Sequence, residues 1–291
     1  RRDFTVNAMS LDRSGELFDP FNGEADLAAG HIRFIGDASL RVREDALRIL
    51  RFFRFHASIG AGEPDRTGLL ACINERALLS TLSRERVRME LVKLVAAPGA
   101  PDAVATMSEA GLLGALLGGV PLPASFARLA AIEARLGLAP EAARRLAALG
   151  VLVQEDAARL RERLRLTNEE FRRLDGIGYG WRGIEPKKGE IAAKTALAVT
   201  GPRGFRDRVL IAFARSGAAV EDAAWRDLMT LPERWQAPMF PISAADFVAR
   251  GFAEGPALGT ALIRAKALWM AADFPRERAR LDAIITAAVA G

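Results

Sequence analysis

From residue 41 onward, the sequence shows almost no strand pattern and is typical of a long succession of helices. Gly and Pro residues punctuate the chain between these segments. The expected helices cover residues 44–58, 66–79, 84–96, 101–110, 124–136, 141–149, 154–165, 168–175, 188–199, 204–216, 221–235, 244–250, 256–272 and 276–289. With 291 residues, the chain is long enough for two or more domains. We therefore predict a mostly α, multi-helix fold.

The first forty residues follow a different pattern. Residues 5–11 alternate with the period of a strand, and residues 12–15 (DRSG) separate two short segments in a way that predicts a hairpin. Residues 31–35 are expected to form another short strand. This part is thus predicted to be a small N-terminal β remnant at the end of an α/β domain.

The charge and cysteine content narrow the class of protein. Lys and Arg number 41 against 36 Asp and Glu, for a net charge of +5. This balance favours a polyanionic partner without establishing one. The single cysteine, Cys72, excludes a disulfide framework within the chain and suits a reducing compartment, so a cytoplasmic location is expected. No signal peptide and no run of about twenty apolar residues is present, so no membrane partner is expected.

A charged stripe marks the expected helix that follows residue 40. At 100° per residue, Glu44, Asp45, Arg48 and Arg51 fall within an arc of roughly 120°, while apolar residues fill most of the remainder. Such a helix is largely buried, and its charges must face a cleft, a partner charge or a ligand. The simpler alternative is an ordinary i,i+4 ion pair between Glu44 and Arg48, worth a few tenths of a kcal/mol.

Four motifs in this order resemble one known family. They are residues 1–9 (RRDFTVNAM), 18–27 (FDPFNGEADL), 44–51 (EDALRILR) and 83–91 (SRERVRMEL). The sequence resembles the class II tRNA nucleotidyltransferase and bacterial poly(A) polymerase family, whose best known members are the CCA-adding enzymes. The detailed match covers residues 1–95. The resemblance implies the end of a nucleotidyltransferase head at 1–40, a neck at 41–120, a helical body at 121–220 and a tail at 221–291.

The resemblance also implies an activity. Family members add C and A from CTP and ATP to the 3′ end of tRNA without a nucleic-acid template. The family's Mg²⁺-binding carboxylates and its Gly-rich phosphate loop lie upstream of the RRDFT motif. We therefore assign no catalytic residue and no metal ligand here, and we expect the chain to need the missing N-terminal head segment and to be inactive alone.

Asp45 and Arg48 have the chemistry to select a base. Cytosine and adenine each present an amino donor beside a bare ring nitrogen. Asp45 can accept from that amino group while Arg48 donates to the ring nitrogen. Uracil and guanine present the reverse pattern, so both contacts become repulsive. The family resemblance implies this same role, with Glu44 supporting the arginine.

A second group is expected to hold the sugar and the triphosphate. The resemblance places such contacts at Arg2 and Asp3, because arginine suits phosphate oxygens and a carboxylate can accept from a ribose hydroxyl. Arg51 is a further candidate for phosphate. Asn7 is either a nucleotide contact or a residue that orders the local turn. For Arg1 and Arg2, a solvated pair of terminal charges is the alternative.

The sequence indicates RNA-binding residues less specifically than it indicates nucleotide-binding residues. The basic candidates are Arg159, Arg163, Arg172 and Arg173 in the body, and Arg264 and Lys266 in the tail. Acidic residues interleave with these cations, so an ordinary solvated helix surface is the alternative. Recognition of the folded shape and backbone of tRNA would suit such a surface.

Two other functions stay open. The same motifs serve a poly(A) polymerase or an enzyme restricted to C or to A addition. A non-catalytic helical RNA-binding module is the alternative of another class.

Overall fold

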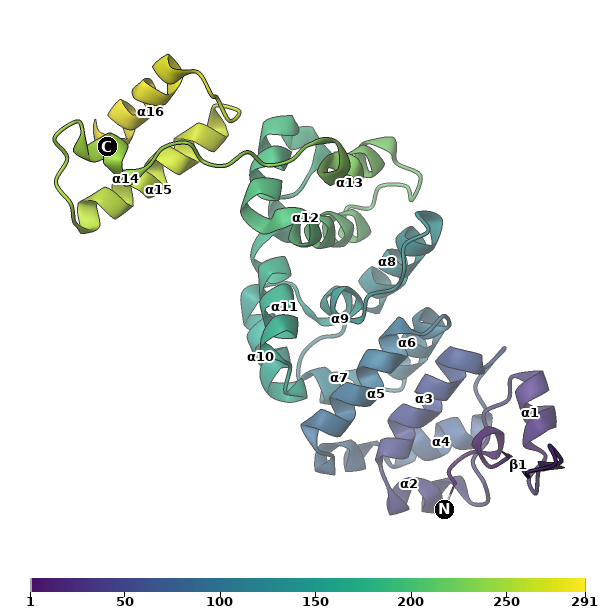
Figure 1. The fold of residues 1–291 in the computed structure, drawn as a ribbon. Coiled ribbons are helices and arrows are strands. Elements are labelled where there is room, and N and C mark those ends of the chain that lie inside the picture. The colour runs from purple at the N-terminus through teal and green to yellow at the C-terminus, as the bar shows by residue number, and fades with distance from the viewer. Residues whose placement is uncertain (1, 291) are drawn as a thin grey trace. The chain divides into compact units, whose positions relative to one another are not determined.

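The computed structural model describes residues 2–290, and the fold is mostly α with one two-stranded sheet, as predicted (Figure 1). The chain divides into two compact units. The first comprises residues 2–179 and Phe213–Val220, and the second comprises Gly180–Ala212 and residues 221–290. The implied joint between neck and body, after residue 120, lies inside the first unit. The four-part division into head, neck, body and tail stays a prediction.

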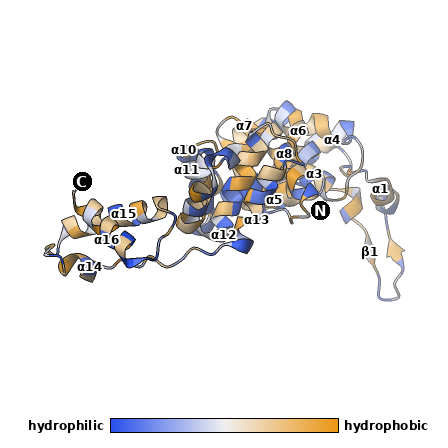
Figure 2. Cartoon of the chain, turned by 90° about the horizontal axis from the view of Figure 1, so that it is seen from above, coloured by the Kyte–Doolittle hydropathy of each residue, from blue (hydrophilic) through white to orange (hydrophobic). Residues whose placement is uncertain are grey.

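The first unit begins with a short irregular segment instead of the strand expected over residues 5–11. Thr5–Asn7 forms a 3-10 turn, and only β1 (Ser10–Leu11) is extended. The expected hairpin is confirmed, because β1 pairs antiparallel with β2 (Leu17–Phe18). The hairpin projects from the helices (Figure 2). The expected strand at 31–35 is reduced to a single bridge between Phe4 and Phe34.

Aromatic packing anchors this N-terminal segment to the helices. Phe4 and Phe34 are buried with ring centroids 4.8 Å apart, and Phe34 stacks on Phe52 at 5.6 Å. The backbone N–H of Thr5 donates to the carbonyl of Arg33 at 3.1 Å, and that of Ile35 donates to Asp3 at 3.1 Å. These contacts hold Asp3 beside the helix that carries Phe52.

Ten α-helices form the rest of the described part of the first unit. They are α2 (Ala38–Glu44), α3 (Leu47–Ile59), α4 (Arg66–Asn74), α5 (Arg84–Ala96), α6 (Ala100–Glu109), α7 (Leu112–Leu117), α8 (Pro123–Arg135), α9 (Ala142–Gly150), α10 (Gln154–Leu164) and α11 (Asn168–Gly180), preceded by α1 (Gly23–Ala29). The sequence patterns missed the short helices α1 and α7, and they joined the end of α2 to α3 in one expected helix. A 3-10 turn, Arg76–Thr81, ends the segment that was expected to be helical to residue 79.

Local capping explains where two of these helices begin. The hydroxyl of Ser83 accepts from the backbone of Arg86 at the start of α5. Before α11, the Thr167 hydroxyl accepts from the backbone of Glu170 at 3.2 Å, and the Glu170 carboxylate accepts from the backbone of Thr167 at 2.7 Å. This reciprocal pair is a capping box, which satisfies two backbone donors at the helix start.

The prediction of one continuous helix through Asp45 is wrong. Asp45 ends α2 in an extended conformation, with φ −156° and ψ 104°, and α3 begins at Leu47. The Asp45 carboxylate accepts a hydrogen bond from the backbone of Leu47 at 3.1 Å. Aspartate side chains compete in this way for backbone donors, which favours helix ends over helix interiors.

α3 packs against α5 and α6. Phe52 and Phe53 are fully buried, as expected, whereas Phe55 is half-buried. Hydrophobic and hydrophilic residues occupy different sides of these helices (Figure 2). The apolar side of α3 is therefore buried, and its charged residues lie on another side, where they contact other elements.

A buried ion cluster joins α8 and α9 to the end of α5. Glu133 is 1% exposed and pairs with Arg144 at 2.6 Å and with Arg145 at 2.7 Å. Arg145 also donates to the carbonyl of Val95 at 2.9 Å. These bonds compensate for the loss of hydration that buried charges would otherwise suffer.

The second unit contains α12 up to residue 212, followed by α13 (Ala223–Arg234), α14 (Ala244–Val248), α15 (Pro256–Ala271) and α16 (Arg278–Ala290). The span of α12, Glu190–Arg215, is interrupted at Gly201, where φ is 69° and ψ is 171°, so the two helices predicted there are confirmed. The core of α14–α16 includes Phe247 and Trp269, and the Trp269 indole donates to the carbonyl of Pro275 at 2.9 Å. Within residues 2–290, no helix has the length and apolarity needed to cross a bilayer.

Candidate functional site

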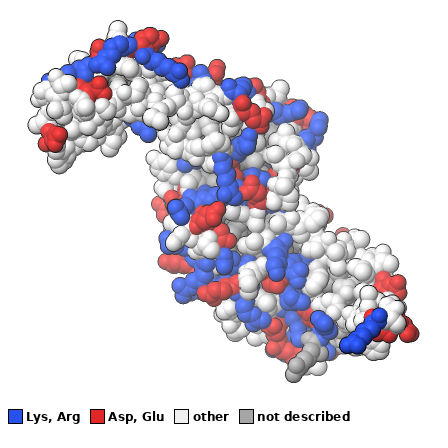
Figure 3. Space-filling view, viewed as in Figure 1, with Lys and Arg blue, Asp and Glu red and all other residues white. Residues whose placement is uncertain are grey.

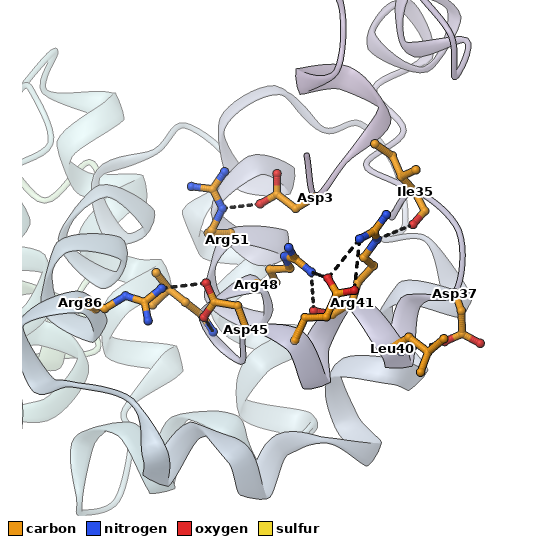
Figure 4. A network of polar contacts seen from close by, with 11 residues as sticks. Asp3, Ile35, Asp37, Leu40, Arg41, Asp45, Arg48, Arg51 and Arg86 are labelled. Atoms are coloured by element: carbon orange, nitrogen blue, oxygen red, sulfur yellow. Dashed lines mark hydrogen bonds and ion pairs between the residues drawn. The ribbon is translucent and has the colours of Figure 1, made fainter. Parts of the chain in front are cut away.

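Arg48 lies in the first turn of α3, where two acceptors hold its side chain. Its Nη1 donates to Glu44 Oε2 at 2.6 Å and to the carbonyl oxygen of Arg41 at 2.7 Å (Figure 4). The side chain is 13% exposed. The predicted i,i+4 pair with Glu44 is therefore present, and it spans the break between α2 and α3.

Glu44 links two arginines. Arg41 donates from Nη1 to Glu44 at 3.1 Å and from Nε to the carbonyl of Ile35 at 3.0 Å. The hydrogen bond from Arg48, followed by that from Arg41, lowers the pKa of Glu44 below its ordinary value. Glu44 consequently stays ionised and keeps Arg48 oriented through the neutral pH range.

Asp45 is held by partners other than Arg48. Its Oδ1 accepts from the Leu47 backbone, and its Oδ2 accepts from Arg86 Nη2 at 2.7 Å. Arg86 lies on α5, which makes this contact a bridge between α5 and the break after α2 (Figure 4). The Asp45 side chain is 34% exposed, so it does not point into packed core.

The two residues proposed to read a base keep unused hydrogen-bonding capacity. Among the described residues, Arg48 Nε and Nη2 donate to no protein acceptor, and no ion pair joins Asp45 to Arg48. A carboxylate has about four lone-pair positions, of which protein donors fill two at Asp45. An acceptor and a donor thus lie close together at the start of α3, where both remain accessible.

Asp3 and Arg51 form the second part of the site. Arg51 donates from Nε to the Asp3 carboxylate, and Asn7 donates to the same carboxylate at 2.5 Å. Burial alone would raise the pKa of Asp3, but the hydrogen bonds from Arg51 and Asn7 hold it below its ordinary value. The hydrogen bond with Asp3 also raises the pKa of Arg51, with smaller effects from the charges of Glu90 and Asp45. Asp45 therefore lies within electrostatic range of this pair.

Asn7 orders the local turn, which was one of its two predicted roles. Its side-chain oxygen accepts from the backbone of Phe4 at 3.2 Å, while its amide group holds Asp3. Arg2 is exposed and has no polar partner among the described residues. Arg1 lies outside the described residues.

The carboxylates near the N-terminus do not fit a metal site. Asp19 accepts from the backbones of Gly23 and Glu24, and Asp26 accepts from Thr5 and Arg33. Asp3 is likewise held by Arg51 and Asn7. No group of three metal-ligating side chains occurs within residues 2–290.

The predicted RNA-binding arginines of the first unit differ in whether protein groups already bind their side chains. Arg159 donates to the carbonyls of Leu117 and Gly150 and pairs with Asp156 at 2.5 Å. Arg173 pairs with Glu141 at 2.5 Å. Arg163 and Arg172 are exposed, and Arg163 has no polar partner in the described part of the chain.

Two further arginines of the same stretch border an open pocket of about 530 Å³ on α10 and α11. Arg161 lies over the ring of Phe171 at 4.5 Å, and Arg165 also lines the pocket. Lys and Arg side chains interleave with Asp and Glu over the visible face (Figure 3). On this face the basic residues thus form small groups and not one continuous patch.

The two tail candidates, Arg264 and Lys266, are both exposed on α15. Residues two positions apart in a helix point about 200° away from each other. They therefore cannot both contact the same side of one ligand.

Sequence patterns missed the two arginines that complete the site. Arg41 was not assigned a role, and Arg86 is 41 positions from the carboxylate that it holds. Three other charged residues of α5 brace the fold: Arg84 reaches the carbonyl of Glu162, Arg88 pairs with Glu170, and Glu90 pairs with Arg54. No local feature of α5 distinguishes Arg86 from its neighbouring arginines.

Two family models match parts of the chain. Residues 1–33 match the poly(A) polymerase head domain. Residues 69–122 match a family described as the probable RNA and SrmB-binding site of polymerase A.

Relatives with curated names match nearly the whole chain. The mouse (Mus musculus) CCA tRNA nucleotidyltransferase 1, mitochondrial, is 29% identical over 289 residues, which cover 97% of this chain and 64% of the relative. The Danio rerio protein of the same name is 31% identical over 293 residues with the same coverage. The CCA-adding enzyme of Geobacillus stearothermophilus is 42% identical over 113 residues, or 38% of this chain and 28% of that enzyme. The chain thus spans about 64% of the length of the vertebrate relatives.

Solved structures share the fold. The Bacillus stearothermophilus CCA-adding enzyme in complex with CTP superposes with a TM-score of 0.76 at 24% identity, covering 98% of this chain and 72% of that chain. The Thermotoga maritima CCA-adding enzyme complexed with tRNA gives a TM-score of 0.66 at 17% identity, with the same coverage.

The head and RNA-binding matches, together with the helical fold, make this chain similar to polymerase-type nucleotidyltransferases. Within that class, the relatives and solved structures that match most of the chain are CCA tRNA nucleotidyltransferases and CCA-adding enzymes. The resemblance drawn from the four motifs is therefore confirmed.

Proposed function

We propose that this chain selects CTP and ATP and holds tRNA for the template-independent addition of C and A to the tRNA 3′ end. One observation carries the proposal. Asp45 and Arg48 lie beside each other, accessible and separately held, with an acceptor and two donors unused by the described residues. That pair complements the amino group and bare ring nitrogen that cytosine and adenine share, and it opposes uracil and guanine.

The neighbouring pair supports the same proposal. Arg51 is partly exposed, and its pKa is raised mainly by Asp3, so it offers a permanent positive charge to a triphosphate. Asp3 has a largely buried carboxylate that stays ionised at neutral pH, and it can accept from a ribose hydroxyl. Arg2 is exposed and can bind phosphate oxygens. Base, sugar and phosphate contacts would then follow one side of α3.

RNA binding rests on exposed cations of both units. Arg163 and Arg172 in the first unit and Arg264 and Lys266 in the second have accessible side chains. The stretch 69–122 matches a family described as a probable RNA-binding site, which supports the first unit as one contact region. The relatives carry tRNA or CCA in their names, which supports tRNA as the RNA.

Phosphoryl transfer also needs divalent metal, and Mg²⁺ is the ion we expect. It would neutralise charge on the triphosphate. The described carboxylates do not fit such a site, because Asp3, Asp19 and Asp26 are each held by protein donors. We therefore propose that residues outside this chain hold the metal and that the isolated 291 residues transfer no nucleotide. The cytoplasmic location remains an expectation.

The proposal is tested by extension of tRNA that lacks its 3′ CCA. The full-length protein is supplied with Mg²⁺ and with each nucleoside triphosphate in turn, and products are resolved by length. We expect addition from CTP and ATP and little from UTP or GTP. Addition from ATP alone would favour a poly(A) polymerase or A-adding enzyme, addition from CTP alone a C-adding enzyme, and no addition with retained tRNA binding a non-catalytic module.

Substitution then tests the residues. Asp45→Ala and Arg48→Ala should each narrow the preference for CTP over UTP by about tenfold or more, because paired polar contacts discriminate bases by about 1–3 kcal/mol. Asp102→Ala is the control, since Asp102 is an exposed carboxylate of α6 in the same unit. Unchanged base preference in both site variants would reject the assignment.

A further inference from the structure

The two residues that we assign to base selection carry opposite charges and are close enough to neutralise each other. The backbone N–H of Arg48 donates to the carbonyl of Asp45 at 3.0 Å. The two side chains therefore start from adjacent points of the backbone. A direct pair between them would use up the acceptor of one and a donor of the other. No such pair forms in the described structure, and each side chain is held by another residue.

The restraint on Arg48 is local, whereas the restraint on Asp45 comes from another helix. Glu44 and the carbonyl of Arg41 hold Arg48 from α2. Arg86 holds Asp45 from α5, across 41 positions of sequence, with Nη2 to Oδ2 at 2.7 Å. Figure 4 shows Arg86 approaching Asp45 from the side away from Arg41. Asp45 is therefore drawn away from the arginine that it would otherwise neutralise.

Arg86 has the geometry of a fixed restraint. Its backbone lies in the first turn of α5, which is capped by Ser83, and Val87 next to it is buried. The Arg86 side chain is 44% exposed, and Asp45 is its only acidic partner among the described residues. One hydrogen bond from Arg86 and one from the Leu47 backbone leave about two lone-pair positions of the carboxylate for a ligand.

We propose that Arg86 is a positioning residue for base selection, which keeps the Asp45 carboxylate apart from Arg48 and turned toward the incoming base. This inference rests on the proposed function of Asp45 and Arg48. Without Arg86, the Asp45 side chain can rotate toward Arg48 and form an ion pair with it. That pair would occupy the acceptor and the donor that the base needs. The nucleotide then has to break that new ion pair before it binds.

The test is steady-state kinetics of the full-length protein with CTP, ATP and UTP. Arg86→Ala should raise the KM for both CTP and ATP by about tenfold with a much smaller change in kcat, since one charge-assisted contact that orients a ligand group is worth about that factor. The preference for CTP over UTP should narrow in the same variant. Arg86→Lys keeps the positive charge and should restore part of the loss.

Arg43→Ala is the matched control. Arg43 lies on α2 in the same unit, its side chain is 59% exposed, and it pairs with Glu75 at 2.6 Å. Its loss removes a surface ion pair of the same kind without touching Asp45, so KM should stay unchanged. A rise in KM in Arg43→Ala equal to that in Arg86→Ala would overturn the proposal.

A double variant distinguishes positioning from a purely structural role. Once Asp45 is replaced by Ala, Arg86 has no carboxylate to hold, so adding Arg86→Ala should change neither KM nor base preference further. A further loss in that background would overturn the proposal. So would an Arg86→Ala protein whose thermal unfolding temperature falls while its KM and base preference stay at the wild-type values.

Failure of this inference can be told apart from failure of the proposed function. A wild-type protein without preference for CTP and ATP removes the proposed function and this inference with it. A wild-type protein that prefers them, with Arg86→Ala showing the same preference and the same KM, removes only the role of Arg86.

Discussion

Arg51 donates from its Nε to the carboxylate of Asp3, although the two residues lie 48 positions apart in the chain. The contact depends on the aromatic group of Phe4, Phe34 and Phe52, which holds the N-terminal segment against α3. Glu90 of α5 lies on another side of the same guanidinium, with Oε1 at 3.8 Å from Nη1. Packing of the three segments thus assembles one charged site.

The Asp3–Arg51 pair makes stability depend on pH. The folded-state pKa of Asp3 lies below its ordinary value of 3.8, because the hydrogen bonds from Arg51 and Asn7 outweigh burial, which alone would raise it. A lowered pKa stabilises the fold above the unfolded-state value, and the benefit is lost as pH falls through the folded pKa. Asp3→Asn should lower the free energy of unfolding by about 1–3 kcal/mol at pH 7.

The difference between the wild type and Asp3→Asn should be constant above about pH 5 and shrink below the ordinary carboxyl pKa. Urea unfolding at several pH values, followed by far-ultraviolet circular dichroism, measures it. All four tryptophans (Trp181, Trp225, Trp235 and Trp269) lie in the second unit, so their fluorescence would not report on this site. A difference that persists unchanged at pH 3 would contradict the assignment.

Glu44→Ala tests the support of Arg48. The change removes one of two acceptors that orient the guanidinium and leaves the Arg41 carbonyl. We expect a rise in KM for CTP and ATP of roughly three- to tenfold, with base preference partly kept, since about 1 kcal/mol of orientation is lost. Glu75→Ala, which breaks the equally short pair with Arg43, is the control. Equal effects of the two substitutions would count against a specific role for Glu44.

Glu133 is expected to be critical for the stability of the first unit. Glu133→Ala leaves the guanidinium groups of Arg144 and Arg145 buried without their shared carboxylate, which typically costs about 3–5 kcal/mol. Circular dichroism on heating or in urea would show the loss. Glu162→Gln, at an exposed position of α10, should change stability by less than about 0.5 kcal/mol. A Glu133→Ala protein as stable as Glu162→Gln would show that the cluster does not stabilise the fold.

Arg163 and Arg159 should differ in their effect on RNA binding. Arg163 is exposed and has no polar partner in the described chain, whereas Arg159 holds the carbonyls at the ends of α7 and α9. Arg163→Ala should weaken tRNA binding and reduce the salt dependence of log Kd by about 0.7–0.9, the value for one phosphate contact. Arg159→Ala should mainly lower stability. Fluorescence anisotropy with labelled tRNA at several salt concentrations decides, and an unchanged salt slope in Arg163→Ala would exclude that contact.

The local features of the fold could be read from the sequence. The succession of helices after residue 40 and the hairpin around residues 12–15 both follow from side chains that act on neighbours within a few positions. The burial of Phe52 and Phe53 follows from helical periodicity in the same way. The short helices α1 and α7 were missed because six or seven residues carry too little periodicity to stand out.

The sequence by itself determined the helical class, the resemblance to a known family and the residue types that can recognise a nucleotide, because periodicity and motifs are properties of neighbouring residues. Only the tertiary structure decided that Arg86 holds the Asp45 carboxylate and that Asp3 meets Arg51. These contacts depend on the distance and rotation between segments that are dozens of residues apart. The aromatic and aliphatic packing of α3 against α5 and the N-terminal segment sets that geometry. Patterns among neighbouring residues do not predict this distance and rotation.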